Sequence, residues 1–462
     1  MPVGAASLGA RAGRRVSSIS RWRAGIALCL LLALLLRVGF VLATRPYPLV
    51  GDALDYNRHA QSIAQTGHYP RSIDGPDGGP TAFRPPLYPY FLAPIYAVAS
   101  TRHAVDFARL AQALLGVAIV GLVGLLSWRL WGRRVALIAL ALASVSPPLI
   151  VVGGALLSET LFVALELAAC LSVLQARTSR RWLRWIALAG VLCGLAALTR
   201  SIGIAMLVPI ALSLAVAGLT GKARGRAAIS TATLLTAFAL TLAPWTVRNA
   251  LVLHSFTPVS TEGGATLAGG YNATVGRQPP SETVWTLPDF ADLYWQPRFR
   301  AQALRTRTAP GLTPSAWRTR VAEPTLDRRL RAAAGGYAFH HPLYALKRTT
   351  FDAAAVFGLL GPRRVPFSFE EQALAKPAAL NAAAYSFYIV FGLAIIGALA
   401  KKARRAPLWL WCVPVVLLLP GVFIESITRL RAPADPFLII LAALALAELR
   451  AALKQRSGVT VS

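Results

Sequence analysis

The chain has 462 residues, of which 55% are hydrophobic and only 15% are charged, whereas a water-soluble domain usually carries about 25% charged residues. This balance, with a mean hydropathy of +0.54, excludes a soluble cytosolic enzyme and a secreted disulfide-bonded scaffold. A formal net charge of +29 would indicate nucleic-acid binding in a soluble protein, but here the basic residues stand in short runs between apolar stretches, as in the cytoplasmic loops of membrane proteins. We therefore predict a multi-pass membrane protein with no nucleic-acid partner.

Ten apolar stretches are long enough to cross about 30 Å of hydrocarbon. The first, Gly25–Ala43, follows a basic segment and could be a cleaved signal peptide, but we expect a retained anchor because many more spans follow. The other nine are Phe107–Leu130, Val135–Val152, Ala155–Gln175, Trp182–Leu198, Ile202–Leu219, Ala227–Trp245, Ala382–Ala400, Leu408–Ile424 and Pro436–Leu453. The pattern predicts an all-α integral membrane protein with about ten transmembrane helices.

The basic residues predict the orientation of these spans. Alternate short connections carry the Arg and Lys residues at 129, 133 and 134, at 177, 180, 181 and 184, at 222, 224 and 226, at 401, 402, 404 and 405, and at 450, 454 and 456. All of them fall on the side of the N-terminal arginines, which the positive-inside rule assigns to the cytoplasm. We expect both termini to be cytoplasmic and the membrane to be the inner (cytoplasmic) membrane of a cell.

Two long loops then lie outside, at residues 44–106 and 248–381. The predicted divisions are a cytoplasmic N-terminus (1–24), a transmembrane catalytic core (25–247), a large outer loop (248–381), C-terminal transmembrane helices (382–453) and a cytoplasmic tail (454–462). Three segments of the outer loops predict helices lying on the membrane surface: Asp55–Gln65, the short and proline-broken Leu87–Ser100, and Arg328–Phe357, which is interrupted at His341-Pro342.

The first outer loop contains two closely spaced carboxylates. Asp52 and Asp55 stand three residues apart in Gly51-Asp52-Ala53-Leu54-Asp55-Tyr56, so on a helical turn they share a face. A carboxylate at the outer surface can take a proton from an acceptor hydroxyl or amine. The alternative is that Asp52 caps the helix that follows.

Two arginines stand where a phosphate at headgroup level could be bound. Arg84 precedes Pro85-Pro86 and Tyr88, in a turn that proline makes stiff, and Arg248 follows Trp245 at the outer end of the seventh span. The planar guanidinium group suits a phosphate. Either residue could instead be an ordinary interfacial anchor.

Further charged residues lie close to the outer ends of predicted spans, where charges are costly and usually functional. They are Glu159, Arg200, Arg429 and Arg431. A purely structural ion pair of Glu159 with an arginine is the alternative to a substrate contact. The four cysteines have no paired spacing, so the sequence indicates neither a metal site nor a disulfide framework.

Taken together, the motifs GDALDY, TGHY, RPPLYPYFLAPIY, LSETLF, GLAALTRS, PWTVRN, TEGG with GGYN, and RLRAPADP resemble the bacterial GT-C membrane glycosyltransferases with a protein-mannosyltransferase-type domain. That family includes lipid A aminoarabinose transferase. The resemblance extends from about Leu34 to Leu444 and weakens between Gly276 and Leu326.

This resemblance implies a GT-C fold and transfer of a sugar from a polyprenyl-phosphate donor to an envelope acceptor (a lipid, a glycan or a protein) on the outer face. It implies that Asp52 is the catalytic base and that Arg84 and Arg248 bind the donor phosphate. Many relatives carry an adjacent acidic pair where this chain has Asp52-Ala53, so a second-carboxylate or metal role is in doubt, and we expect no cofactor, although a divalent metal is not excluded.

We expect a single displacement with inversion, because a phosphate leaves without a proton donor. The remaining candidate substrate-binding residues are Asp55, Tyr56, Tyr88, Glu159, Arg200, Arg429 and Arg431. Membrane lipids are further expected partners, and the segment Arg277 to Glu323 is expected to set acceptor choice. The alternative function is a transporter or flippase of a lipid-linked sugar, although transporters usually bind their substrates near the bilayer midplane.

Overall fold

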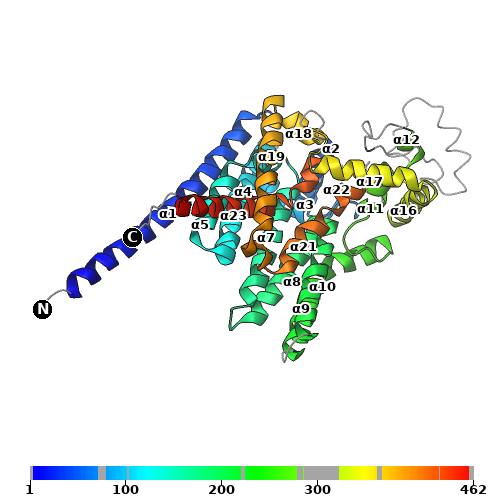
Figure 1. The fold of residues 1–462 in the computed structure, drawn as a ribbon. Coiled ribbons are helices and arrows are strands. Elements are labelled where there is room, and N and C mark those ends of the chain that lie inside the picture. The colour runs from blue at the N-terminus through cyan, green and yellow to red at the C-terminus, as the bar shows by residue number, and fades with distance from the viewer. Residues whose placement is uncertain are drawn as a thin grey trace, which may run out of the picture.

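The computed structural model describes residues 4–70, 80–100, 103–219, 224–277, 285, 322–361, 367–425 and 427–456. Every regular element in these ranges is a helix (Figure 1). The helices of the first half are α1 (Gly4–Ala43), α2 (Gly51–Thr66), α3 (Leu87–Val98), α4 (Ala104–Trp131), α5 (Arg133–Val145), α6 (Pro147–Gly154), α7 (Glu159–Ala176), α8 (Trp182–Thr199), the 3₁₀ helix η1 (Ser201–Met206), α9 (Leu207–Leu219) and α10 (Arg224–Leu253). Those of the second half are α11 (Glu262–Gly270), α12 (Ala273–Gly276), α16 (Glu323–His340), α17 (Pro342–Val356), α18 (Phe369–Leu374), α19 (Pro377–Leu399), α20 (Lys401–Arg404), α21 (Leu408–Leu417), α22 (Leu419–Phe423), η5 (Thr428–Arg431) and α23 (Asp435–Arg456).

Seven of the described helices are long and apolar enough to cross a membrane. They are α4, α7, α8, α10 and α19, together with Ser20–Ala43 of α1 and Asp435–Gln455 of α23. The pair α5 and α6 makes an eighth if its two parts, which meet at an angle of 50°, are one broken span. The prediction of an all-helical multi-pass membrane protein is confirmed, whereas the count of ten spans is not.

The difference in count comes from breaks that hydropathy does not detect. The expected span Ile202–Leu219 starts as the 3₁₀ helix η1, and the expected span Leu408–Ile424 is divided into α21 and α22, with Pro414 inside the first and Pro420 at the start of the second. Pro147 and Pro148 likewise begin α6 after the bend. Proline lacks the amide hydrogen that a continuous helix needs, which fits the new helices that start at Pro147 and beside Pro420, whereas η1 contains no proline.

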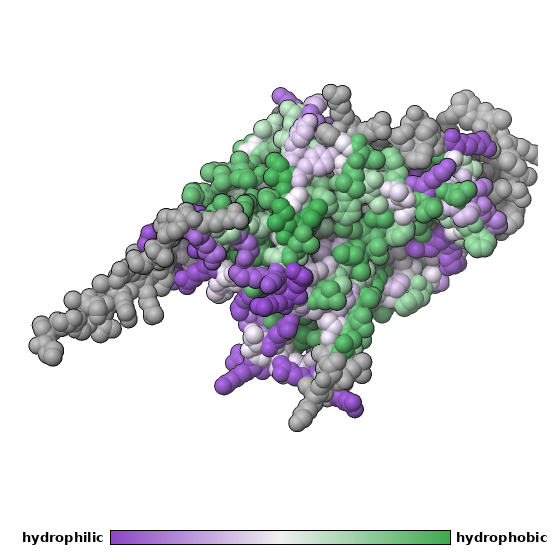
Figure 2. Space-filling model, viewed as in Figure 1, coloured by the Kyte–Doolittle hydropathy of each residue, from purple (hydrophilic) through white to green (hydrophobic). Residues whose placement is uncertain are grey.

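The interior of the bundle is one large apolar cluster to which α4, α5, α7, α8 and α23 contribute buried side chains such as Phe162, Leu167 and Phe437. Other large apolar side chains point outward, among them Leu240, Ile389 and Leu399, each more than 60% exposed. Figure 2 shows this surface as a broad hydrophobic region over the bundle. Such an exterior is stable in lipid and not in water.

The expected surface helices are present. Asp55–Gln65 lies within α2, which ends at Gly67 in the left-handed conformation (φ 72°), and Leu87–Ser100 contains α3, which at 12 residues is too short to span. The pair expected in Arg328–Phe357 is α16 and α17, separated at His341. Buried residues of α11 and α16 form a second, smaller core beside the bundle (Figure 1). Most of the segment Arg277 to Glu323 lies outside the described residues.

Candidate active site

Asp52 lies in the first turn of α2, where the chain folds back after α1. The N-cap of that helix is Val50, so Asp52 is not the cap that the sequence left open as an alternative. Gly51 has φ +53°, and a Cβ there would collide with the carboxylate of Glu370 in α18. That carboxylate accepts a hydrogen bond from the backbone N–H of Asp52 at 2.8 Å. The start of α2 is therefore held by α18, which lies 318 positions later in the chain.

Two arginines from distant parts of the chain grip the Asp52 side chain. Arg84, from the turn before α3, forms an ion pair with one carboxylate oxygen, and Arg429 of η5 contacts the other at 2.5 Å between Nη2 and Oδ2. The side chain of Asp52 keeps 23% of its surface exposed, against 13% for Arg84 and 11% for Arg429. The carboxylate is therefore partly open to an incoming molecule, while the two cations are nearly enclosed.

More carboxylates surround these arginines. Asp55 contacts the same nitrogen of Arg84 at 2.7 Å, and Glu262 at the start of α11 lies 3.5 Å from its other terminal nitrogen. Glu159, only 1% exposed, contacts Arg200 at 2.6 Å and Arg429 at 3.6 Å. Three guanidinium groups and four carboxylates thus form one network that joins α2, α7, α11 and η5, and we call these seven residues the charged network.

Hydroxyl groups border this network. Tyr56 donates a hydrogen bond to the hydroxyl of Ser158 at 3.1 Å, and Arg200 donates to the same oxygen at 3.2 Å. The guanidinium group of Arg84 lies over the ring of Tyr56, 5.4 Å from its centre. Tyr56 therefore lies against the charged network.

The carboxylates at this site differ in their affinity for protons. Burial alone would raise the pKa of Asp52, but the positive charges of Arg84 and Arg429 outweigh burial and hold that pKa well below its ordinary value. For Glu262, burial outweighs the charges of Arg84 and Arg200, so its pKa is raised. The pKa of the neighbouring Glu425 rises to about 7, again chiefly because of burial. At neutral pH the site therefore contains a firmly ionised Asp52 and carboxylates that bind protons more readily.

Two residues expected at the site lie beside it. Arg248 donates hydrogen bonds to the carbonyl of Thr81 at 2.7 Å and to the side chain of Asn249 at 2.9 Å, and its guanidinium lies over the ring of Trp245. Tyr88 is fully buried behind Tyr56, with the two rings in an edge-to-face contact. Neither side chain contacts Asp52 in the structure, and Arg429 is the second arginine on that carboxylate.

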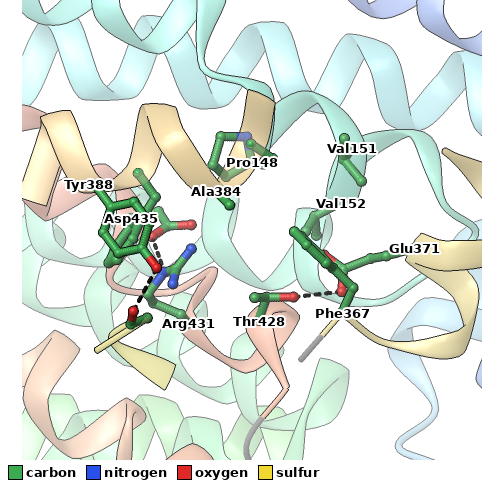
Figure 3. Close-up of a pocket in the computed structure, with 13 residues that line it drawn as sticks. Pro148, Val151, Val152, Phe367, Glu371, Ala384, Tyr388, Thr428, Arg431 and Asp435 are labelled. Atoms are coloured by element: carbon green, nitrogen blue, oxygen red, sulfur yellow. Dashed lines mark hydrogen bonds and ion pairs between the residues drawn. The ribbon is translucent and has the colours of Figure 1, made fainter. Parts of the chain in front are cut away.

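Arg431 also points away from Asp52, into a narrow pocket between α6, α19 and the start of α23 (Figure 3). It forms an ion pair with Asp435 at 2.9 Å and donates to the carbonyl of Val356 at 2.7 Å. Its guanidinium is 3.4 Å from the centre of the Phe387 ring. These contacts hold the segment that carries Arg429, so Arg431 supports the site from behind.

Glu262, Glu370 and Glu425 are residues of the site that sequence reasoning did not single out. Glu262 stands in the TEGG motif, which marked it only as part of a glycine-containing turn. Glu370 and Glu425 lie in the large outer loop and just after α22, and no local pattern indicates that they meet Asp52. Among the described residues, no three His, Cys, Asp or Glu side chains are arranged to hold a metal ion.

Comparison with known proteins gives one family match. Residues 83–247 match the model of the family described as dolichyl-phosphate-mannose-protein mannosyltransferase. This stretch contains Arg84, Glu159 and Arg200 and ends one residue before Arg248. A comparison with curated proteins finds no match.

Solved structures with a similar fold include the archaeal oligosaccharyltransferase AglB from Archaeoglobus fulgidus in complex with an inhibitory peptide and a dolichol-phosphate, with a TM-score of 0.54 and 16% identity over 96% of this chain. The same organism's oligosaccharyltransferase in the apo form gives a TM-score of 0.55 and 17% identity over 96% of the chain. This chain spans about half the length of both, covering 52% of each. ArnT from Cupriavidus metallidurans bound to undecaprenyl phosphate is matched over 96% of this chain and 81% of its own length at 15% identity, with a TM-score of 0.38 that carries no weight for the fold.

Proposed function

We propose that this chain, which has the fold of the GT-C membrane glycosyltransferases, transfers a sugar from a polyprenyl-phosphate donor to an acceptor. The family match over residues 83–247 and the fold shared with an oligosaccharyltransferase support a transferase that uses a lipid-linked donor. The observation that carries the proposal is the partly exposed carboxylate of Asp52 between the guanidinium groups of Arg84 and Arg429. An anion-binding pair of cations beside a carboxylate is what transfer from a phosphate requires.

In the proposed reaction, the donor phosphate binds to Arg84 and Arg429, with Arg200 near by. Guanidinium groups bind phosphate through paired hydrogen bonds, and in a partly dehydrated site they stabilise the charge that develops on a departing phosphate. The bond between the anomeric carbon and the phosphate oxygen breaks with its electron pair on the phosphate. The arginines thus balance the leaving-group charge, and the lipid-linked sugar is the only cosubstrate the scheme needs.

Asp52 acts as the base in this scheme, but only after the donor is bound. While both of its oxygens are paired with arginines, its pKa is too low for efficient proton transfer. A phosphate competes for the same guanidinium groups and brings a negative charge close to the carboxylate, and both changes raise its pKa. Asp52 then takes the proton of the acceptor hydroxyl or amine, which attacks from the face opposite the phosphate and inverts the anomeric centre.

The proposal includes the setting of the reaction. We place the protein in the inner membrane of a cell with the charged network on the outer face and both termini in the cytoplasm, in line with the positive-inside pattern of the short loops. The acceptor is an envelope lipid, glycan or protein, and the sugar is a hexose or a pentose. Arg248 is proposed to bind the donor at the rim of the site. Its guanidinium lies over the ring of Tyr69, and the Tyr69 hydroxyl donates to the Arg84 carbonyl at 2.7 Å.

The test is the variant Asp52→Asn in membranes supplied with a radiolabelled polyprenyl-phosphate sugar. Asparagine keeps the size of the side chain but cannot take a proton, so we expect transfer to fall by at least about 100-fold. The matched control is Asp106→Asn at the start of α4, because Asp106 forms a more exposed pair with Arg45 at 3.0 Å outside the charged network. The control should keep its activity.

Each outcome has a defined reading. Loss of transfer in Asp52→Asn alone supports the assignment of the base. Full transfer by Asp52→Asn refutes it, and retained movement of the labelled lipid across the membrane without transfer by the wild type would indicate a flippase instead.

A further inference from the structure

A second cluster of basic residues lies at the opposite end of the bundle from the charged network. Helix α7 connects the two regions, because Glu159 is its first residue and Arg177 follows its last. An α-helix of this length spans about 27 Å, close to the hydrocarbon thickness of a bilayer. The two regions therefore face opposite sides of the membrane, and the second is the side that the sequence predicts to be cytoplasmic.

At this second end the helix ends border an open cavity of about 480 Å³, which is within the usual range for small-ligand sites, about 300–1,000 Å³. It lies beside the C-terminal ends of α4 and α7 and beside α20, the short helix that connects α19 to α21. Four of its lining residues are basic: Arg129, Arg177, Lys402 and Arg405. Among the described residues, no acidic side chain lines it, and Figure 2 shows hydrophilic side chains gathered around the lower end of α19.

The charges of this cavity are poorly compensated. Lys402 forms an exposed ion pair with Glu448 at 2.8 Å, and Arg129 lies over the ring of Trp128. Within the described part of the chain, the side chains of Arg177 and Arg405 have no hydrogen bond or ion pair to another group. Two of the four basic side chains thus have no partner and the other two have only weak contacts, so an anion can bind to them.

The rest of the lining is apolar. Leu130, Trp131 and Leu174 contribute to its wall, and the ring of Trp131 stacks on that of Trp411 at 6.2 Å, with an angle of 17° between the planes. Tryptophan prefers the boundary between hydrocarbon and headgroups. A basic rim over an apolar wall at a helix end matches a phosphate joined to acyl chains better than it matches a free ion, because a free ion gains nothing from the apolar wall.

We infer that this cavity is a binding site for the phosphate headgroup of an anionic membrane phospholipid, separate from the donor site. A lipid bound there contacts the ends of α4 and α7 and the α19–α21 connection, three segments far apart in sequence, and so holds that end of the bundle together. The inference does not depend on the proposed glycosyl transfer.

The test measures lipid binding by the full-length protein in detergent, using native mass spectrometry and thermal unfolding during titration with phosphatidylglycerol. Parallel titrations use phosphatidylcholine, which has no net charge, and inorganic phosphate. Each basic residue near an anionic headgroup contributes about fivefold to binding, so the double variant Arg177→Gln/Arg405→Gln should bind phosphatidylglycerol about 30-fold more weakly. The matched control is Arg180→Gln/Arg181→Gln, which removes the same charge from exposed residues of the neighbouring connection that do not line the cavity.

The inference is supported if phosphatidylglycerol binds saturably and raises the unfolding temperature of the wild type and the control, but not of the cavity variant. It is overturned if both double variants lose binding equally, because diffuse surface charge would then explain the effect. Equal protection by inorganic phosphate would indicate a soluble anion site. Equal protection by phosphatidylcholine, whose phosphate is balanced by its choline group, would show that the net negative charge of the headgroup is not recognised. Either result overturns the assignment to an anionic phospholipid.

Discussion

The two ends of the bundle use arginine in opposite ways. In the charged network every guanidinium is largely enclosed and faces carboxylates, as Arg84 does with Asp52 and Asp55. The cavity at the other end, lined by Arg129, Arg177, Lys402 and Arg405, is called the basic cavity. Its basic side chains are exposed, and Arg177 has no partner in the described part of the chain. Arginine therefore carries different costs at the two ends, because a buried cation without its counter-ion is far more destabilising than an exposed one.

This contrast also separates two kinds of anion binding. A phosphate that enters the charged network must compete with carboxylates already in place, so binding is coupled to the protonation of those carboxylates. A phosphate that enters the basic cavity displaces mainly water and salt ions. The first arrangement suits a reacting group, and the second suits a lipid that only has to stay bound.

The largest effect is expected for Arg84→Ala, which removes the partner of Asp52, Asp55 and Glu262 together. Transfer should fall by about 1,000-fold, the loss typical of one donor to a developing anion. The free energy of unfolding should fall by about 3 kcal/mol, because three partly buried carboxylates lose their counter-charge. Radiolabel transfer and denaturant unfolding in micelles measure the two effects. Arg84→Lys should recover part of both, since it restores the charge but not the planar fork, and normal transfer by Arg84→Ala would remove Arg84 from the mechanism.

Glu159→Gln tests the buried side of the network. Glu159 is 1% exposed and contacts both Arg200 and Arg429, so its neutralisation leaves two enclosed cations less well balanced. We expect the free energy of unfolding to fall by about 2–3 kcal/mol. A change below about 0.5 kcal/mol, the size expected of an exposed pair, would show that the pair is not part of a buried network.

A smaller effect is expected from pH, through Glu425. Burial raises its pKa from 4.5 to about 7, so over that interval the folded protein binds a proton that the unfolded chain has released. The free energy of unfolding should therefore fall as pH rises from about 5 to 7, by about 1 kcal/mol per pH unit, and level off above. The pH dependence that Asp52 contributes has the opposite sign. Because its pKa is lowered in the folded protein, Asp52 stabilises the fold at pH values above its ordinary pKa of 3.8, and this stability is lost on further acidification.

The variant Glu425→Gln isolates that contribution. It should remove the decrease between pH 5 and 7 while leaving the loss at acidic pH unchanged, as measured by unfolding in buffers of equal ionic strength. An unaltered slope in the variant would mean that another group titrates in this interval.

The smallest effect is expected at the opposite end, for Glu448→Gln. Its pair with Lys402 is exposed, with 59% of the lysine side chain and 44% of the glutamate side chain open to solvent. Removing such a pair should change the free energy of unfolding by less than about 0.5 kcal/mol. A loss as large as that of Glu159→Gln would break the contrast between the two ends of the bundle.

The sequence predicts the membrane class, the surface helices and part of the site, because these depend on local patterns. Asp52, Asp55 and Arg84 stand in short motifs of the first loop, and in the structure Arg84 forms ion pairs with both carboxylates. The count of spans failed at Ile202–Leu219, which begins as a 3₁₀ helix, and at Leu408–Ile424, where a separate short helix starts beside Pro420. Such breaks leave the mean hydropathy of a stretch high.

The rest of the site depends on contacts between distant parts of the chain. Nothing near Glu370 in the sequence indicates that its carboxylate accepts from the Asp52 backbone. Arg429 and Arg431 are two residues apart in η5 but pair with different carboxylates, Asp52 and Asp435. From the sequence alone, Arg429 and Arg431 are equally good candidates for a substrate contact, and Arg248 is as good a candidate as Arg429 for a place beside Asp52. Only the packing of α18 and η5 distinguishes them.

The pairing of Asp52 with Arg429 joins residues that are 377 positions apart, and this affects how the protein is made. Asp52 emerges early during translation, whereas Arg429 emerges much later, shortly before the hydrophobic helix α23. Until that helix has entered the bilayer, the early carboxylate lacks one of its two cationic partners. An unfinished chain therefore has an incomplete charged network, and the pairing of Asp52 with both arginines becomes possible only after the late segment that carries Arg429 has reached the bundle.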